Sequence, residues 1–63
     1  MHPMIQNKIK VTIFDDNNLL RTSLSEIIND SECCTVVSHY AHTIDAIEHI
    51  IVDEPDVIIM DIN

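Results

Sequence analysis

Two apolar segments that each end in aspartate constrain this chain more than any other feature. Residues 9–14 lead into Asp15 and Asp16, and residues 57–60 lead into Asp61. If the two segments are neighbouring parallel strands, their carboxyl ends meet at one edge of the sheet, where open α/β sheets bind ligands. Two carboxylates about 4 Å apart repel each other by about 4 kcal/mol at an effective dielectric constant near 20. We therefore predict a bound cation at this edge, and Mg²⁺ fits best because it prefers oxygen ligands.

The chain alternates between strand-like and helix-like patterns. Apolar residues recur at every second position or in short β-branched runs in the predicted strands, and at helical spacing between them. The predicted elements are a strand over 8–14, a helix from the Asn17–Asn18 pair to residue 29, a strand over 35–40, a helix that begins after Thr43 and ends before Pro55, and a strand over 57–60. The order β-α-β-α-β indicates an α/β fold with a parallel sheet and right-handed crossovers.

The helix ends rest on polar residues. Asn17 or Asn18 is predicted to cap the first helix, whose apolar residues Leu20, Leu24, Ile27 and Ile28 we interpret as core packing. Thr43 is predicted to cap the second helix and Asp45 to lie in its first turn, with an apolar side made by Ile44, Ala46, Ile47, Ile50 and Ile51. The chain has no glycine, so left-handed turn positions are expected at asparagine or aspartate, in the pairs 17–18 and 29–30.

The third predicted strand raises a question of coverage. Residues 57–60 are continuously apolar, a pattern typical of a parallel strand covered on both faces. With three strands and two helices, however, this strand would be an unpaired apolar edge, which favours association with other chains. We expect either a truncated protein or a half-domain that pairs with a second copy.

Composition excludes several classes of function. The chain has 63 residues, enough for one small domain, and a net charge of −8, which disfavours binding of DNA or RNA by this chain itself. Cys33 and Cys34 are adjacent, which matches no zinc-finger spacing and indicates reduced thiols. No apolar stretch approaches the roughly 20 residues of a membrane span, and the first residues lack a signal-peptide pattern. A cytoplasmic location, without membrane association, is expected.

Two segments together resemble a known family. Residues 13–17 (IFDDN), followed by a helix, and residues 55–63 (PDVIIMDIN) look like the receiver domain of bacterial two-component response regulators. Residues 36–47 resemble the NarL/FixJ-type regulators, which carry a LuxR-type DNA-binding domain further along. The resemblance implies a flavodoxin-like (CheY-like) parallel sheet. It covers the first half of a receiver over residues 8–63, after an N-terminal arm of residues 1–7.

The resemblance implies a role for each acidic residue. Asp61 resembles the phosphoacceptor, which takes a phosphoryl group from a sensor histidine kinase. Asp16 resembles the direct Mg²⁺ ligand and Asp15 its acidic neighbour, which holds the ion through water. Asp61 and the backbone carbonyl of Asn63 complete the implied metal site. Such a module is a phosphoacceptor and not an independent enzyme, although the full domain assists its own phosphorylation and dephosphorylation.

The sequence also departs from the receiver pattern. The family uses a serine or threonine after a fourth strand and a lysine after a fifth, and neither strand is present in these 63 residues. The family's Met-Pro and glycine-containing loop after the phosphoacceptor is also missing. Contact with DNA would require an output domain that this chain lacks, so a transcriptional role would belong to a longer parent protein.

Three alternatives accompany this interpretation. A half-receiver could act only as a self-associating fragment, as a homodimer without phosphotransfer. A phosphatase of the haloacid dehalogenase type also has a nucleophilic aspartate after its first strand, but residues 15–18 (DDNN) lack the required Asp-x-Asp and the following Gly-Thr. A zinc site made by His39, His42 and His49 with a cysteine matches no common ligand spacing.

Overall fold

The structure, a computed structural model, describes residues 7–61 of the chain. Five elements follow one another: β1 (Ile9–Asp15), α1 (Asn18–Asp30), β2 (Cys34–Tyr40), α2 (Ala46–Asp53) and β3 (Val57–Asp61). The predicted order is therefore confirmed, with boundaries that differ from the predicted ones by two residues at most. The implied metal ligand Asn63 and most of the predicted N-terminal arm lie outside the described residues.

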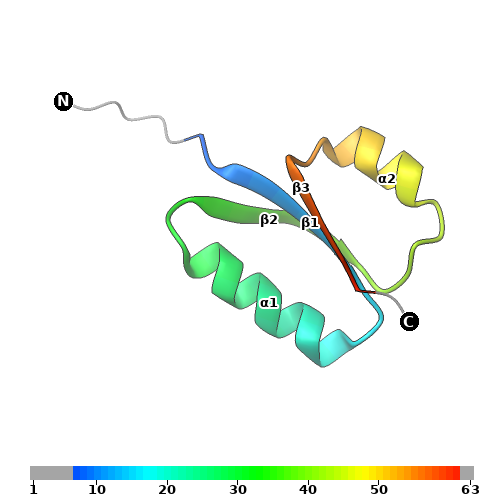
Figure 1. Cartoon of the computed structure of the whole chain (residues 1–63), viewed down its shortest axis with the longest axis horizontal. Helices are drawn as coiled ribbons and strands as arrows, with labels where there is room; N and C mark the ends of the chain where they lie inside the picture. The colour runs from blue at the N-terminus through cyan, green and yellow to red at the C-terminus, as the bar shows by residue number, and fades with distance from the viewer. Residues whose placement is uncertain (1–6, 62–63) are drawn as a thin grey trace.

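The three strands form one parallel sheet in the order β2-β1-β3 (Figure 1). This is the order at the N-terminal portion of a flavodoxin-like sheet, whose full order is 2-1-3-4-5. The fold class predicted from the sequence is thus confirmed. The register of β1 with β2 shifts between Val11 and Thr12, whereas β1 and β3 pair without interruption from Val11↔Val57 to Asp15↔Asp61.

The core lies in the central strand. Residues 11–15 of β1 are all buried, and the side chains of Ile13 and Phe14 have no exposed surface. Thr12 is equally buried, and its hydroxyl lies 2.9 Å from that of Ser38, so the polar group in the core is hydrogen-bonded. A strand with neighbours on both edges and a helix near each face has little contact with water.

The two helices lie on opposite faces of the sheet (Figure 1). Successive side chains of a strand point to opposite faces, and residues 39 and 40 of β2 illustrate this. His39 accepts a hydrogen bond from Arg21 of α1, whereas Tyr40 donates one to Asp53 of α2. Each crossover therefore leaves its helix on a different side of β1.

Helix α1 begins as the sequence predicts. Asn17 is the N-cap, and its side-chain oxygen accepts a hydrogen bond of 3.0 Å from the backbone N–H of Leu20. Leu24 and Ile28 are half-buried against the sheet, as expected. Leu20 and Ile27, which were assigned to the same packing row, are 40% and 68% exposed, so these two assignments are wrong.

Helix α2 begins at Ala46, two residues later than the sequence predicts. Its N-cap is Asp45, in a left-handed conformation and without a side-chain capping bond, and the backbone oxygen of Thr43 accepts from Ala46. Glu54, after the last turn, is also left-handed. Ile44 precedes the helix, while Ile47 and Ile51 are exposed, so most of the predicted apolar side of α2 is not buried.

The expected left-handed positions were therefore wrong. Asn17 has an extended conformation because it caps α1, and residues 18, 29 and 30 are inside that helix. The positive φ values of 61° and 51° occur at Asp45 and Glu54, the two ends of α2. An eight-residue helix between two strands needs sharp reversals at both ends, and without glycine these fall to residues with side chains.

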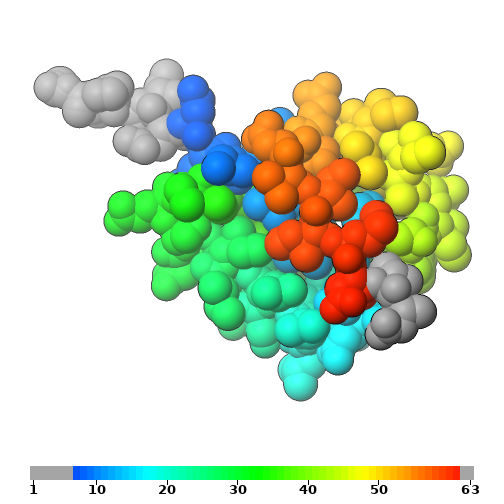
Figure 2. Space-filling view, viewed as in Figure 1, coloured from blue at the N-terminus to red at the C-terminus, as the bar shows by residue number. Residues whose placement is uncertain are grey.

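Strand β3 is an edge strand. It pairs with β1 and with no other strand among residues 7–61, and Val57, Ile58 and Met60 are exposed. Figure 2 shows β3, in orange and red, at the surface of the molecule. The apolar pattern suggested coverage on both faces, which is wrong for the described part of the chain. Asp56 fixes the start of β3, because its N–H donates to the oxygen of Lys10 and its Oδ2 accepts from the N–H of Lys10.

Candidate functional site at the carboxyl edge of the sheet

Asp15 is the best-defined acidic residue of the chain. It ends β1, and only 2% of its surface is exposed. Its Oδ1 accepts a hydrogen bond of 2.9 Å from the backbone N–H of Asn17, which fixes the side chain against the start of α1. Its Oδ2 is buried and has no hydrogen-bond partner among the described residues. Buried polar atoms are normally satisfied, so this oxygen is the strongest local indication of a missing ligand.

Asp61 lies beside Asp15. The two residues are register partners at the carboxyl ends of adjacent parallel strands, which lie about 4.8 Å apart in any sheet. Asp61 is exposed, whereas Asp15 is buried. The sheet therefore brings Asp15 and Asp61 together, as predicted from the two Asp-terminated segments. That one of them is buried and the other exposed was not predicted.

Asp16 has a different environment. It forms a bend directly after β1 and is exposed, and Asn17 next to it is committed to capping α1. Among residues 7–61, no three His, Cys, Asp or Glu side chains approach closely enough to hold a metal ion. The register pairing of Asp15 with Asp61 is present in the sheet. A metal site shared by all three aspartates stays a prediction.

The edge also contains a cation that the sequence analysis missed. Arg21, in the first turns of α1, donates from Nη1 to the backbone oxygen of Asp15 at 2.7 Å and from Nε to Nδ1 of His39 at 3.1 Å. Its other Nη donates to the side-chain oxygen of Asn18. The position of Arg21 four residues after the cap Asn17 could have indicated this, because such a residue lies above the helix start.

A second polar cluster joins β2 to α2. The hydroxyl of Tyr40 donates to Oδ2 of Asp53 at 2.6 Å, and the Tyr40 ring stacks between Phe14 and His49, with ring centroids 5.3 and 4.0 Å away. The hydrogen bond from Tyr40 lowers the pKa of Asp53, and the same bond raises the pKa of Tyr40. This cluster, the Tyr40 clasp (Phe14, Tyr40, His49 and Asp53), was also missed by the sequence analysis.

The three histidines considered for zinc have separate surroundings. His39 is exposed on the α1 side of β2 and bonded to Arg21, and His42 is exposed in the following loop. His49 is stacked on Tyr40 on the other face of the sheet. They therefore lie on different sides of the molecule.

No helix in the described residues is long and apolar enough to cross a membrane.

A cation fits the carboxyl edge chemically. The spare oxygen of Asp15 is buried, anionic and unpartnered among the described residues, and carboxylate oxygens are the ligands that Mg²⁺ takes from proteins. Asp61 is the register partner of Asp15, Asp16 follows it in sequence, and both are exposed, so they would contribute oxygens through water or after side-chain movement. The donor set is all oxygen, which favours a hard ion over a transition metal.

Comparison with known proteins adds no further assignment. No family model, no curated protein and no solved structure matches the chain with significance. The findings therefore support a small parallel α/β unit of three strands and two helices, in the order β-α-β-α-β, with an acidic carboxyl edge.

Proposed function

We propose that this chain is the first half of a response-regulator receiver domain, which accepts a phosphoryl group on Asp61 from a sensor histidine kinase. One observation carries the proposal: Asp61 is the register partner of Asp15 at the carboxyl ends of adjacent parallel strands. The strand order β2-β1-β3 and the segments IFDDN and PDVIIMDIN support it.

The contrast between the two carboxylates suits phosphoryl transfer. Asp61 is exposed, so a phosphohistidine on another protein can approach it. Its carboxylate oxygen attacks phosphorus, the P–N bond breaks, and the imidazole leaves with its electron pair and takes up a proton. The product is an acyl phosphate, a covalent intermediate that water can hydrolyse.

The other aspartates at this edge would hold the cation that neutralises the phosphoryl group. Asp15, with its spare buried oxygen, and Asp16, exposed beside it, would hold Mg²⁺ together with Asp61. When bound, the ion supplies neutralisation of the phosphoryl oxygens as charge develops on them. Asn17 keeps Asp15 in place through its backbone N–H and caps α1, so it supports the edge without being a ligand.

The proposal places the chain in a larger regulatory context. The likeness of residues 36–47 to NarL/FixJ-type regulators favours a parent protein that binds DNA through a separate output domain. The charge of −8 argues against DNA binding by these residues themselves.

Phosphoramidate, a small molecule with the P–N bond of phosphohistidine, provides the test. The folded chain incubated with phosphoramidate and Mg²⁺ should gain one phosphoryl group, measured by intact mass and mapped to Asp61 by hydroxylamine trapping. Asp61→Asn should gain none, whereas Asp30→Asn, at an exposed aspartate ending α1, should behave like the unsubstituted chain. Labelling of Asp61→Asn equal to that of the unsubstituted chain, or no labelling of the folded unsubstituted chain, would contradict the proposal.

A second candidate function rests on β3. Its outer edge pairs with no strand among residues 7–61, and three of its apolar side chains are exposed. Such an edge can recruit a second copy, so the chain could act as a self-associating unit. Sedimentation velocity over a wide concentration range tests this: a dimer that dissociates in Met60→Lys would favour it, and a monomer at every concentration would exclude it.

A further inference from the structure

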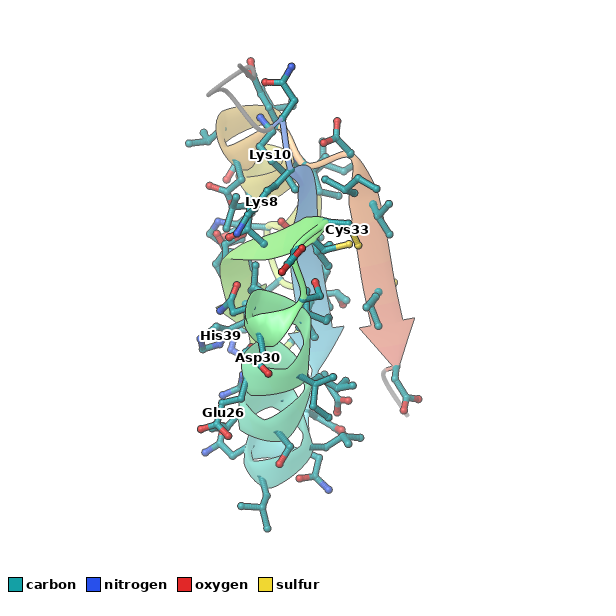
Figure 3. The ribbon with its side chains drawn as sticks, turned by 90° about the vertical axis from the view of Figure 1, so that its left-hand side faces the viewer. Lys8, Lys10, Glu26, Asp30, Cys33 and His39 are labelled. Atoms are coloured by element: carbon teal, nitrogen blue, oxygen red, sulfur yellow. The ribbon has the colours of Figure 1, made fainter. Side chains whose placement is uncertain are left out.

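Cys33, which is exposed, and Cys34, which is half-buried, form a pair of thiols at the start of β2. Both are free, and their Sγ atoms lie 3.4 Å apart (Figure 3, where Cys33 is labelled). Successive side chains of a regular strand point to opposite faces, which would separate the sulfurs. Residues 31–33 form a bend before β2, and this bend allows the two sulfurs to approach each other.

The backbone favours a bridging atom over a direct disulfide. The Cys33–Cys34 peptide bond is trans, and adjacent Cα atoms across such a bond are about 3.8 Å apart. Disulfides usually join Cα atoms about 4.4–6.8 Å apart, so a direct bond would require backbone distortion. Two sulfurs held at about 2.3 Å by one tetrahedral ion are about 3.7 Å apart, close to the separation found here. An atom placed between the sulfurs therefore needs little movement.

The number of ligands restricts the identity of that atom. Structural zinc takes four protein ligands, and among residues 7–61 no third Cys, His, Asp or Glu joins the pair. A trivalent, pyramidal, sulfur-seeking atom needs two sulfurs and completes its shell with a substituent of its own. We propose that Cys33 and Cys34 are a dithiol site for trivalent arsenic, presented as arsenite or an organic arsenoxide.

The binding reaction balances without an oxidant. An arsenoxide is hydrated in water to carry two hydroxyl groups on arsenic. Two As–O bonds break, two As–S bonds form, and the two thiol protons leave with the hydroxyl groups as two molecules of water. Arsenic stays trivalent and both sulfurs keep their oxidation state.

The local environment suits this condensation. The hydrogen bond with Cys33 raises the pKa of Cys34, with burial and the neighbouring thiolate charge acting in the same direction. A protonated thiol reacts slowly with peroxides and disulfides, which require the thiolate. The raised pKa therefore makes Cys34 less prone to oxidation and leaves its thiol available to a reagent that displaces thiol protons.

The dithiol site is independent of the proposed phosphoacceptor function. Cys34 is the register partner of Ile9, and the N–H of Ile9 donates to the oxygen of Cys33 at 2.8 Å. These residues lie at the amino ends of parallel strands, whereas Asp15 and Asp61 lie at the carboxyl ends. Failure of one proposal leaves the other unaffected.

Phenylarsine oxide is the probe. One equivalent added to the full 63-residue chain should produce a single adduct by intact mass and should protect both thiols from a thiol-counting reagent. Because Cys33 and Cys34 are the only cysteines, the count is unambiguous. A small 1,2-dithiol should remove the arsenical, and the same concentration of a monothiol should not.

Two serine variants decide between bridging and single-thiol attachment. In Cys33→Ser and Cys34→Ser, loss of the intramolecular second thiol should weaken binding about 100-fold or more. Circular dichroism serves as the folding control, and exposed Cys33 is the substitution least expected to disturb the fold. Binding by either folded variant as tight as that of the parent chain, or an adduct that leaves one thiol reactive, would overturn the proposal.

Discussion

The two helix–strand units of this chain differ in how deeply the strand is buried and in how the helix is capped. In the first, β1 is buried from Val11 to Asp15, and α1 begins at a side-chain cap. In the second, β3 is largely exposed, and α2 lies between two left-handed residues without a side-chain cap. Both units nevertheless end their strands in aspartate at the same edge of the sheet. An apolar pattern therefore indicates how much surface a strand can bury, whereas the neighbouring elements determine how much it does bury.

This contrast suits the division of work that we propose for the edge. A residue that holds an ion benefits from a fixed, buried position, which Asp15 has. A residue that receives a group from another protein has to be accessible, and Asp61 is. The well-packed unit therefore supplies the proposed binding carboxylate, and the exposed unit supplies the proposed nucleophile.

Truncating one large side chain in each strand gives the largest expected difference. Phe14 and Met60 are register partners, with Phe14 fully buried and Met60 54% exposed. Phe14→Ala should cost about 3–5 kcal/mol of unfolding free energy, enough to unfold so small a domain, whereas Met60→Ala should cost less than about 1 kcal/mol. Urea unfolding followed by circular dichroism measures both, and equal losses would show that β3 is as well packed as β1.

Removing the cap of α1 should have the next largest effect. Asn17→Ala leaves the N–H of Leu20 without its side-chain acceptor and should lower stability by about 1 kcal/mol. Asp45→Ala at the start of α2 removes no capping bond, so its loss should be smaller. A greater loss from Asp45→Ala than from Asn17→Ala in the same urea experiment would show that α2 is the better anchored helix.

Glycine at the end of α2 should stabilise the weaker unit. Glu54 has a φ of 51°, a conformation that costs a non-glycine residue roughly 1 kcal/mol or more. Glu54→Gly should therefore raise stability by up to about 1 kcal/mol, after the greater chain entropy of glycine is subtracted. Thermal unfolding of Glu54→Gly beside Glu54→Ala measures this gain, and a glycine variant no more stable than the alanine variant would refute it.

The pH dependence of the Tyr40 clasp is the smallest predicted effect. Asp53 has a lowered pKa, so its contribution to stability is present above its ordinary pKa of about 3.9 and is lost as pH falls further. Tyr40 has a raised pKa, so its contribution is present below about pH 10 and is lost as pH rises through its folded value. Tyr40→Phe should flatten the stability profile at both ends, with Thr35→Val as a control at another β2 hydroxyl. A stability profile that Tyr40→Phe leaves unchanged would show that the Tyr40–Asp53 hydrogen bond does not contribute to the pH dependence of stability.

Much of the fold follows from local patterns in the sequence. The Asp-terminated apolar segments predicted adjacent parallel strands and the pairing of Asp15 with Asp61, and Asn17 was expected as a cap. The strand patterns and the cap depend on residues close together in the chain, and the general preference of alternating strands and helices for a parallel sheet supplied the pairing. Arg21 and the Tyr40 clasp depend on contacts between different elements, which residue spacing alone does not reveal. The exposure of Ile27 likewise depends on which side of α1 faces the strands.

The left-handed ends of α2 were missed for another physical reason. Asparagine and aspartate are the best substitutes for glycine, but their preference is weak compared with the need to connect α2 to both strands. Asp45 and Glu54 occupy the positions where the chain reverses, and Glu54 adopts a conformation that its own chemistry does not favour. The sheet fixes the path that the chain follows into and out of α2, and this path outweighs the conformational preference of the individual residues.

Cation binding at the carboxyl edge is tested by an amide NMR fingerprint of the chain during titration with Mg²⁺. We expect a dispersed spectrum with saturable shifts confined to the residues around Asp15, Asp16 and Asp61, and loss of these shifts in Asp15→Asn. Asp30→Asn, at the far end of α1, should titrate like the parent chain. A dispersed spectrum that Mg²⁺ leaves unchanged, or that shifts equally in Asp15→Asn, would contradict a cation-binding carboxyl edge.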